Sequence, residues 1–218
     1  MKFLITAGPT REPIDPVRYL SNRSSGKMGY AIAEAAIAAG HEVILISGPV
    51  DLDPPRDAEL VSVSTSDEMF DAVHEHLKDR DVLVMCAAVA DYKPKQVSKT
   101  KIKKRDASLS LELAPTRDIL ASLPKQDRQY LVVGFAAETE NVEANARKKL
   151  QEKNCDIVVA NDVSRADSGM ESDENEVTIL FRDGEKKTIS RAPKTNVARE
   201  LIKIFENVCE KRLTKKIA

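Results

Sequence analysis

Continuous apolar runs alternate along this chain with segments of helical periodicity, and this alternation constrains the fold more than any other feature. Strands buried on both faces of a parallel sheet read as solid apolar runs, whereas half-exposed strands alternate apolar with polar residues. The runs predict strands at Lys2–Thr6, Glu42–Ser47, Leu60–Val63, Val82–Val89, Leu131–Ala136, Asp156–Ala160 and Val177–Phe181. The helices predicted between them are Gly26–Ala38, Ser66–Lys78, Arg117–Leu123, Glu140–Lys153 and Thr195–Arg212. This order predicts an α/β fold, a three-layer α/β/α Rossmann-like domain with a mainly parallel sheet.

Local signals set several element boundaries. Gly40 is placed to end the first helix in a left-handed conformation, and Thr65 with Glu68 has the spacing of a capping box. The strictly alternating segment Ser108–Leu113 predicts a half-exposed strand, a β extension of the domain. Residues 164–175 are polar and predict a loop, and the last residues, 213–218, predict a frayed tail. We therefore expect a single domain over residues 1–212.

Composition excludes several classes of protein. The formal net charge of −1 over 218 residues argues against a basic nucleic-acid-binding protein. No apolar run approaches the roughly 20 residues needed to span a bilayer, and the N-terminus turns polar too early for a signal peptide. Cys86, Cys155 and Cys209 are far apart and have no CxxC spacing, so we expect free thiols in a cytoplasmic protein.

A long proline-braced segment, AGPTREPIDPVRYLSNRSSGKMG, follows the first strand. At the carboxyl edge of a parallel sheet, a Gly/Ser-rich turn entering a helix offers free backbone N–H groups to an anion. The turn at Ser24, Ser25 and Gly26 fits neither of the phosphate motifs GxxxxGK[ST] and GxGxxG, so helix capping by a serine stays an equal alternative. Arg18 and Asn22, on the same segment, have side chains suited to carboxylates, phosphates and oxyanions.

A basic segment, YKPKQVSKTKIKKR, begins at Tyr92 and contains no acidic residue. Three interpretations compete: a solvated charged loop, a nucleic-acid patch, and a mobile flap that closes on a polyphosphate. The scarcity of aromatic residues, 4% of the chain, disfavours the nucleic-acid patch, since bases stack on aromatic side chains. We name residues 92–107 the flap.

Five motifs occur in a characteristic order: ITAGPTREPIDPVRYLSNRSSGKMG, CAAVADYKP, KIKK, VVGFAAET and VVANDV. Together they closely resemble the bacterial phosphopantothenate–cysteine ligases, also called phosphopantothenoylcysteine synthetases. These ligases form one half of a bifunctional flavoprotein of coenzyme A biosynthesis. The resemblance extends from Lys2 to about Arg212 and includes no counterpart of the decarboxylase half, so we expect no flavin.

The resemblance implies a specific reaction. Family members join L-cysteine to the carboxylate of 4′-phosphopantothenate with CTP and Mg²⁺, through an acyl-cytidylate, and release CMP and pyrophosphate. It also implies a homodimer that binds neither nucleic acid nor a membrane. Use of ATP by the same ligase and a non-catalytic dimeric anion-binding module stay open. A nicotinamide-dependent oxidoreductase is disfavoured because the glycine fingerprint of its first turn is missing.

The resemblance also implies roles for single residues. Asn22 would hold the acyl group, the flap lysine Lys101 would promote formation of the acyl-cytidylate, and Arg18 would bind phosphopantothenate in the site of a dimer partner. Ser24, Ser25 and Gly26 would bind the 4′-phosphate together with Arg18. The implied nucleotide-binding residues are Met85, Cys86, Ala87, Asp91, Lys101, Arg117, Asp118, Ile119, Leu120, Phe135, Lys149 and Lys153. At Arg117 the chain departs from the family, which often has Asn-Pro before Asp-Ile. The Mg²⁺ ligands stay unassigned.

Overall fold

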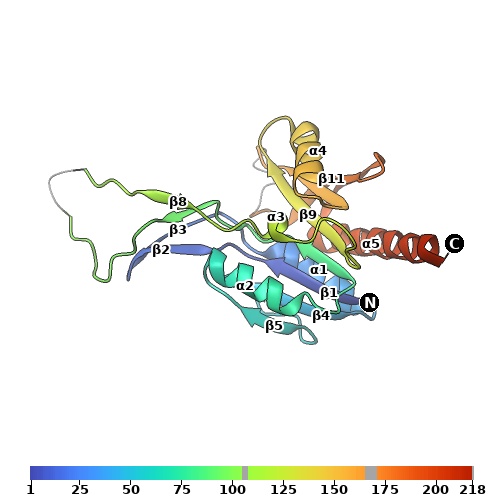
Figure 1. Cartoon of the computed structure of the whole chain (residues 1–218), viewed down its shortest axis with the longest axis horizontal. Coiled ribbons are helices and arrows are strands. Elements are labelled where there is room, and N and C mark those ends of the chain that lie inside the picture. Colours follow the sequence, from blue (N-terminus) through green and yellow to red (C-terminus); the bar gives the residue numbers. More distant parts are fainter. Residues whose placement is uncertain (105–107, 165–170, 218) are drawn as a thin grey trace.

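The computed structural model describes residues 1–104, 108–164 and 171–217, and it is built on one twisted sheet (Figure 1). The sheet has eight strands in the order β12-β11-β10-β9-β6-β1-β4-β5. Its parallel part consists of β5 (Glu59–Ser62), β4 (Glu42–Ser47), β1 (Lys2–Ala7), β6 (Val82–Met85), β9 (Leu131–Glu138) and β10 (Ile157–Asp162). At one edge, β11 (Glu174–Phe181) and β12 (Lys186–Pro193) continue it as antiparallel strands.

Helices cover both faces of the sheet, which confirms the predicted three-layer architecture. One face packs against α1 (Lys27–Ala38) and α5 (Lys194–Ile217), and the other against α2 (Ser66–His76), α3 (Ile119–Ser122) and α4 (Val142–Glu152). Alternate residues of β1 serve the two layers: Phe3 and Ile5 pack with α1, whereas Leu4 packs with α2. Both faces of the strand are buried, which is why its sequence is apolar throughout.

An arm projects from this body (Figure 1). It consists of the hairpin β2 (Arg11–Asp15) and β3 (Arg18–Ser21), the antiparallel pair β7 (Tyr92–Pro94) and β8 (Leu113–Pro115), and the described residues between β7 and β8. The segment predicted to be a proline-braced loop therefore contains a hairpin. The strand predicted at Ser108–Leu113 is wrong, because only Leu113 lies in a strand and the preceding residues lack a neighbouring ladder. The end of the flap, residues 105–107, lies outside the described residues.

Most element boundaries lie where the sequence signals put them. Thr65 and Glu68 form the capping box of α2, and Gly40, after the end of α1, has a φ of +82°. The strand predicted as Val82–Val89 ends at Met85, because the backbone beyond it bonds to the loop after β1 instead of to the sheet. The backbone of α5 is helical to Ile217, five residues beyond the predicted domain boundary at residue 212. Part of the predicted loop 164–175, residues 165–170, lies outside the described residues, and its last two residues begin β11.

Within the described residues, no helix combines the length and the apolar character needed to cross a membrane.

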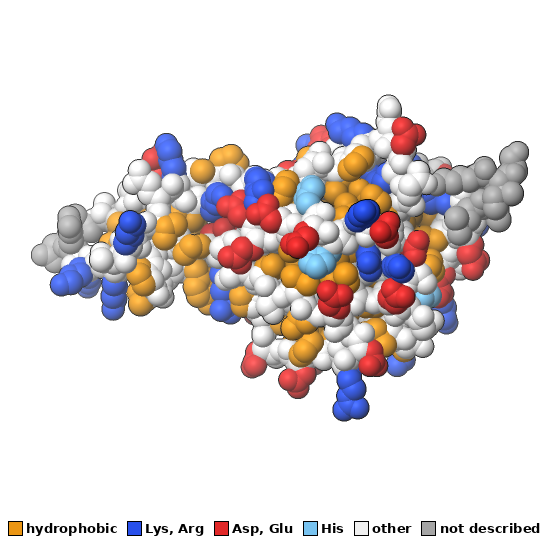
Figure 2. Space-filling view, turned by 60° about the horizontal axis from the view of Figure 1, so that its bottom comes forward, with side chains coloured by type: hydrophobic (Ala, Val, Ile, Leu, Met, Phe, Trp, Pro, Cys, Tyr) orange, Lys and Arg blue, Asp and Glu red, His pale blue; other side chains and the backbone are white. Residues whose placement is uncertain are grey.

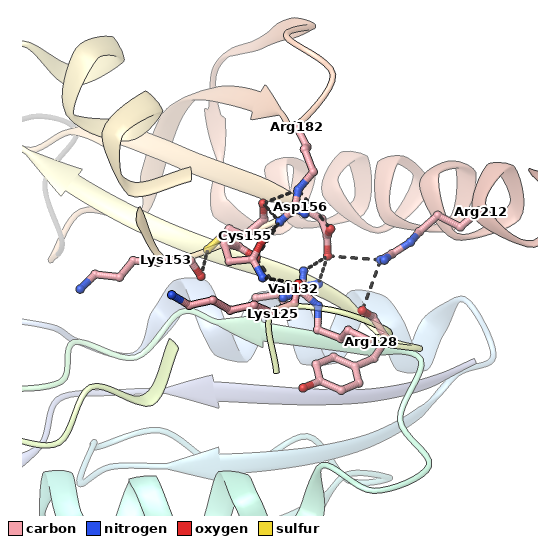
Figure 3. A network of polar contacts seen from close by, with 10 residues as sticks. Lys125, Arg128, Val132, Lys153, Cys155, Asp156, Arg182 and Arg212 are labelled. Carbon is pink, nitrogen blue, oxygen red and sulfur yellow. Dashed lines mark hydrogen bonds and ion pairs between the residues drawn. The ribbon is translucent and has the colours of Figure 1, made fainter. Parts of the chain in front are cut away.

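One carboxylate organises the edge of the sheet opposite the carboxyl ends of the parallel strands (Figure 3). Asp156 accepts hydrogen bonds from the Val132 backbone N–H at 2.8 Å, from Arg128 at 2.7 Å and from Arg212 at 3.2 Å, and it pairs with Arg182 at 3.6 Å. The side chains of Arg128 and Asp156 are 5% and 10% exposed, so water screens this pair poorly. The network connects β9, β10, β11 and α5.

We predict that Asp156→Ala destabilises the protein by about 3 kcal/mol or more, because it leaves the buried Arg128 guanidinium unpaired. Urea unfolding monitored by circular dichroism measures this change in the free energy of unfolding. Glu185→Ala, at an exposed acidic residue near the same edge, is the control and should change it by less than about 0.5 kcal/mol. Equal effects of the two substitutions would show that the network does not stabilise the protein measurably.

Candidate functional site

The candidate site lies where the direction of chain connections reverses. From β1 the chain continues through α1 to β4 on one side, whereas β6, on the other side of β1, leads on to β9 and β10. Such a switch point opens a crevice outside the carboxyl ends of the strands, and ligands of open α/β sheets bind there. Two cavities of about 300 Å³ each occupy this crevice and share Ala87, Val89, Asp91, Phe135 and Lys149. Together they offer the volume of a small-molecule site.

The first cavity, which we name the anion cavity, contains the predicted phosphate turn. Asn22, Ser24 and Gly26 line it together with the first residues of α1. Gly26 is the N-cap of α1, with a φ of +78°, and no side chain caps the helix, so capping by a serine is wrong. The Ser24 hydroxyl instead accepts a hydrogen bond from the Gly26 N–H at 3.3 Å. The uncapped N-terminus of a helix that has no acidic residue in its first turn favours an anion.

Close packing brings this helix end up to the sheet. A Cβ added at Gly29 would lie 2.6 Å from the Cβ of Ala7, so only glycine permits this approach of α1 to β1. Met28 and Gly29 consequently reach the cavity wall. Glycine here acts as it does in dinucleotide-binding turns, by bringing a helix N-terminus close to the strand that precedes it.

The segment after β6, residues 86–90, forms a second wall of the anion cavity, and threonine side chains fix its position. Thr6 accepts a hydrogen bond from the Ala87 N–H at 3.1 Å, and Thr10 accepts one from the Ala90 N–H at 3.0 Å. The Nδ2 of Asn22 donates to the Ala88 carbonyl at 2.9 Å. Because residues 86–90 are small and bonded in this way, a ligand can approach their backbone.

The second cavity, which we name the nucleotide cavity, gathers nearly all of the predicted nucleotide-binding residues. Its wall includes Met85, Ala87, Asp91, Arg117, Asp118, Ile119, Leu120, Phe135, Lys149 and Lys153. Cys86 lines the anion cavity instead, and Lys101 lines neither. Residues from β6, α3, β9 and α4 thus meet at one place, although they are up to 68 positions apart in the chain.

Ion pairs set the charge of the nucleotide cavity. Asp118 caps α3 by accepting the Ala121 N–H at 2.9 Å, and it pairs with Lys153. Burial acts to raise the pKa of Asp118, but the hydrogen bonds from Lys153 and Ala121 outweigh it and lower this pKa. Lys149 donates to the Phe135 carbonyl at 2.6 Å, and its burial lowers its pKa. Lys149 in α4 and Lys153 at its C-cap therefore both line the nucleotide cavity.

Arg117 reaches the cavity wall, but its guanidinium is engaged elsewhere. It bonds Asp67 at 3.1 Å and Asp71 at 2.7 Å, and it lies 4.0 Å above the ring of Phe70 on α2. The residue that departs from the family pattern thus forms ion pairs and a ring contact with α2.

Two predicted catalytic residues, Arg18 and Lys101, lie on the arm. Neither is among the described residues that line the two cavities, and both are exposed. Arg18 bonds to Asp15 and to the Ile102 carbonyl. Ser25 lines a neighbouring pocket together with Asn22 and Ser24. The structure therefore brings Asn22, Ser24 and Gly26 to the cavities of their own chain, but not the two cations of the arm.

The sequence analysis missed three polar residues of the anion cavity, Lys27, Asn175 and Lys194. Lys27 forms an ion pair with Asp173 at 2.6 Å, and Lys194 donates to the Ser172 carbonyl. Burial lowers the pKa of Lys194, and the charge of Lys27 lowers it further. The place of Lys27 in the first turn of α1 was a usable signal. Asn175 and Lys194 carry no local motif, since strand pairing at the far edge of the sheet brings them here.

The fold and these cavities define a Rossmann-like α/β domain with a nucleotide-sized site at its switch point. The chain belongs to the family described as the DNA/pantothenate metabolism flavoprotein C-terminal domain, which matches residues 1–208. This membership confirms the family resemblance seen in the sequence.

Individual relatives agree with this assignment. The chain is 49% identical over 200 residues to the coenzyme A biosynthesis bifunctional protein CoaBC of Bacillus subtilis, covering 91% of the chain and 49% of that protein. It is 47% identical over 190 residues to CoaBC of Escherichia coli, covering 85% and 47%. The chain therefore spans about half the length of these relatives.

Solved structures share the fold. The crystal structure of a CoaBC C-terminal domain is 46% identical, with a TM-score of 0.82 and 96% of both chains covered. A mutant of Cab2 in complex with phosphopantothenate-cysteine has a TM-score of 0.84, covering 100% of this chain and 89% of that one. Its identity of 17% supports likeness of fold alone.

We predict that Cys86 resists alkylation although it lies at the cavity wall. Burial raises the pKa of its thiol to about 12, so about one thiol in ten thousand is ionised at pH 8. Iodoacetamide at pH 8 should modify Cys86 at least about 100-fold more slowly than free cysteine, because the thiolate is the nucleophile. Mass spectrometry measures the rate, and the protein unfolded in urea is the control in which all three cysteines should react. Comparable rates in the folded protein would refute an inert thiol.

Proposed function

We propose that this chain is a CTP-dependent phosphopantothenate–cysteine ligase of coenzyme A biosynthesis, acting in the cytoplasm. It joins L-cysteine to the carboxylate of 4′-phosphopantothenate and releases CMP and pyrophosphate. The observation that carries the proposal is the pair of connected cavities at the switch point. One is lined by Phe135 and by two lysines that suit phosphate groups, and the other has Asn22 beside an uncapped helix N-terminus.

The reaction has two steps. A carboxylate oxygen of phosphopantothenate attacks the α-phosphorus of CTP, the bond to the β-phosphate breaks, and pyrophosphate leaves. The cysteine amine then attacks the acyl carbon, the bond to the cytidylate oxygen breaks, CMP leaves, and the proton of the amine passes to solvent. Each step develops negative charge on a leaving group, so oriented donors and cations stabilise its transition state.

The residues of the cavities fit these needs. Phe135 lines both cavities, and Lys149 and Lys153 can neutralise phosphate charge. Asp91 lines both cavities and can accept hydrogen bonds from cytidine. Asn22 lies beside the shared wall and can donate to the acyl oxygen. We assign the backbone turn at Ser24–Gly26 to the 4′-phosphate of the substrate.

Magnesium would accompany the nucleotide. Among the described residues no three His, Cys, Asp or Glu side chains gather into a cluster that could hold a metal ion. Mg²⁺ keeps several waters and binds readily through substrate phosphates, so the nucleotide would be its main ligand and Asp91 the acidic side chain at hand. The ion supplies charge neutralisation of the triphosphate.

A homodimer would complete the site. The arm carries most of the exposed large apolar side chains of the described residues: Val17, Tyr19, Tyr92, Val97, Leu109, Leu111 and Leu113. Figure 2 shows hydrophobic side chains along the arm. Such a concentration is typical of a protein interface. Since Arg18 does not reach the cavities of its own chain, we propose that the arm delivers it to the site of a second copy.

The experiment that tests the function is pyrophosphate release from the purified protein with 4′-phosphopantothenate, cysteine and Mg²⁺. We expect release with CTP that requires phosphopantothenate. Preference for ATP would overturn the nucleotide assignment and keep the ligase. No release with either nucleotide would favour a non-catalytic anion-binding module. Stoichiometric binding of added flavin would contradict the expectation that this chain binds no flavin.

We predict that Asn22→Asp and Lys101→Gln block different steps. Asn22→Asp should keep pyrophosphate release in a first turnover but slow product formation by about 100-fold or more, because an oxyanion donor is lost. Lys101→Gln should slow pyrophosphate release itself by a similar factor. Quench-flow with chromatographic detection of the acyl-cytidylate separates the two. Normal product formation by Asn22→Asp would remove Asn22 from the mechanism.

We predict a dimer with shared sites. Asn22→Asp and Arg18→Ala are each expected to be poorly active, and mixing the two proteins after subunit exchange should restore activity. In the mixed dimer, one cavity has an intact Asn22 and receives an intact Arg18 from its partner. Sedimentation measures the oligomeric state in parallel. A fully active monomer, or exchanged dimers without restored activity, would refute the shared site.

A further inference from the structure

A single buried carboxylate joins the hairpin to the flap. The Asp15 side chain at the end of β2 is fully buried. Its Oδ1 accepts the backbone N–H groups of Val17 at 2.9 Å and Arg18 at 3.0 Å, which closes the hairpin turn. Its Oδ2 accepts Nε of Arg18 at 3.0 Å, a second nitrogen of the same guanidinium, and the backbone N–H of Ile102 at 3.1 Å. One oxygen therefore holds the turn, and the other holds Arg18 and the flap.

Arg18 completes the connection from its own side. Its guanidinium also donates to the Ile102 carbonyl at 2.8 Å, so both polar groups of the residue after Lys101 are bound. On the other side of Lys101, the Ser98 N–H donates to the Ile14 carbonyl at 3.0 Å. Residues 98–102 have no regular secondary structure, yet these bonds anchor them to the hairpin at both ends.

We propose that Asp15 is a positioning residue for the first step: it joins Arg18 and Lys101 into one unit, so that both cations are presented to the same active site. This inference rests on the function proposed above for the roles of Arg18 and Lys101. Asp15 itself touches no substrate, because its side chain is enclosed. The two cations are 83 positions apart in the chain, and the carboxylate fixes their separation.

The Asp15 carboxylate is a strong acceptor, and a single substitution can remove its bonds to the flap while keeping those to the hairpin turn. The Arg18 side chain holds the pKa of Asp15 well below its usual range, so the group stays ionised at neutral pH. Asparagine keeps Oδ1 and with it the hairpin turn. In place of Oδ2 it has an NH2 group, which is a donor and cannot accept the hydrogen bonds from Arg18 and Ile102. Asp15→Asn should thus free the flap and spare the turn.

Glu12 provides a matched control on the same strand. Its residue is 1% exposed, and its Oε1 accepts the Ser66 N–H at the start of α2 at 2.8 Å. Glu12→Gln also removes one negative charge from the hairpin, but the contact it changes is the one between the hairpin and α2. Ile102→Pro is a second variant that removes the N–H bonded to Asp15 from the flap side and leaves the hairpin sequence unchanged.

The first experiment needs no substrate. Limited trypsin digestion of the full chain, followed by mass spectrometry, gives the rates of cleavage after Lys99, Lys101 and Lys103. At equal melting temperatures, Asp15→Asn should raise all three rates about tenfold over wild type. Ile102→Pro should raise the rates after Lys99 and Lys103 by the same factor, since trypsin does not cleave a Lys–Pro bond, and Glu12→Gln should raise none of them. Unchanged flap cleavage in both variants would overturn the proposal.

The second experiment tests positioning in the reaction. Asp15→Asn should lower kcat for pyrophosphate release about tenfold or more, with KM for CTP within about twofold of wild type. Combined with Lys101→Gln, its effect should be smaller than in the wild-type background, because the part that acts through Lys101 is already lost and only the part that acts through Arg18 remains. The positioning role would be overturned if the two substitutions lowered kcat independently, so that their effects multiplied in the double variant. A normal kcat of Asp15→Asn together with faster flap cleavage would overturn it as well. Absence of wild-type turnover would instead overturn the proposed function and leave the trypsin result standing.

Discussion

The parallel pairing of β1 with β6 is the constraint on which the rest of the structure depends. It sets Thr6 beside Met85, so the two chain segments that leave these strands emerge side by side. Their connections then lead to opposite sides of the strand pair, to β4 and to β9. The Thr6 and Thr10 hydroxyls then bond the backbone after β6, and the Gly29 contact pulls α1 against β1. A shift of this pairing by one residue would turn every side chain of β1 to the other face and close the crevice.

The proposed reaction joins two anionic substrates and needs cations from several directions, and the fold offers cations from separate elements. α1, α4 and α5 contribute Lys27, the pair Lys149 and Lys153, and Lys194 to the two cavities. The arm holds Arg18 and Lys101 apart from them in the single chain. Some of these cations lie close to one another, since the charge of Lys27 lowers the pKa of Lys194, and such a concentration of positive charge favours an anion.

Local sequence predicted the elements whose boundaries have a local cause. The capping box at Thr65 sets the start of α2, and the solid apolar run of Glu42–Ser47 is a buried strand with the predicted ends. Prediction failed where a partner decides the structure. The alternating segment Ser108–Leu113 has strand periodicity without a neighbouring ladder, whereas the polar segment Lys186–Pro193 is the edge strand β12 because β11 pairs with it. Pairing energy depends on the neighbour, which periodicity does not contain.

The sequence by itself determined the α/β class, the family and the residues of the nucleotide cavity, because buried strands and family motifs are written in contiguous residues. Only the tertiary structure decided that Asn175 and Lys194 join the anion cavity, that the Arg117 guanidinium turns to α2, and that Lys101 lies on an arm anchored by Asp15. These placements depend on contacts between segments far apart in the chain. Such contacts follow from packing and from the hydrogen-bonding needs of buried groups, and no local pattern encodes them.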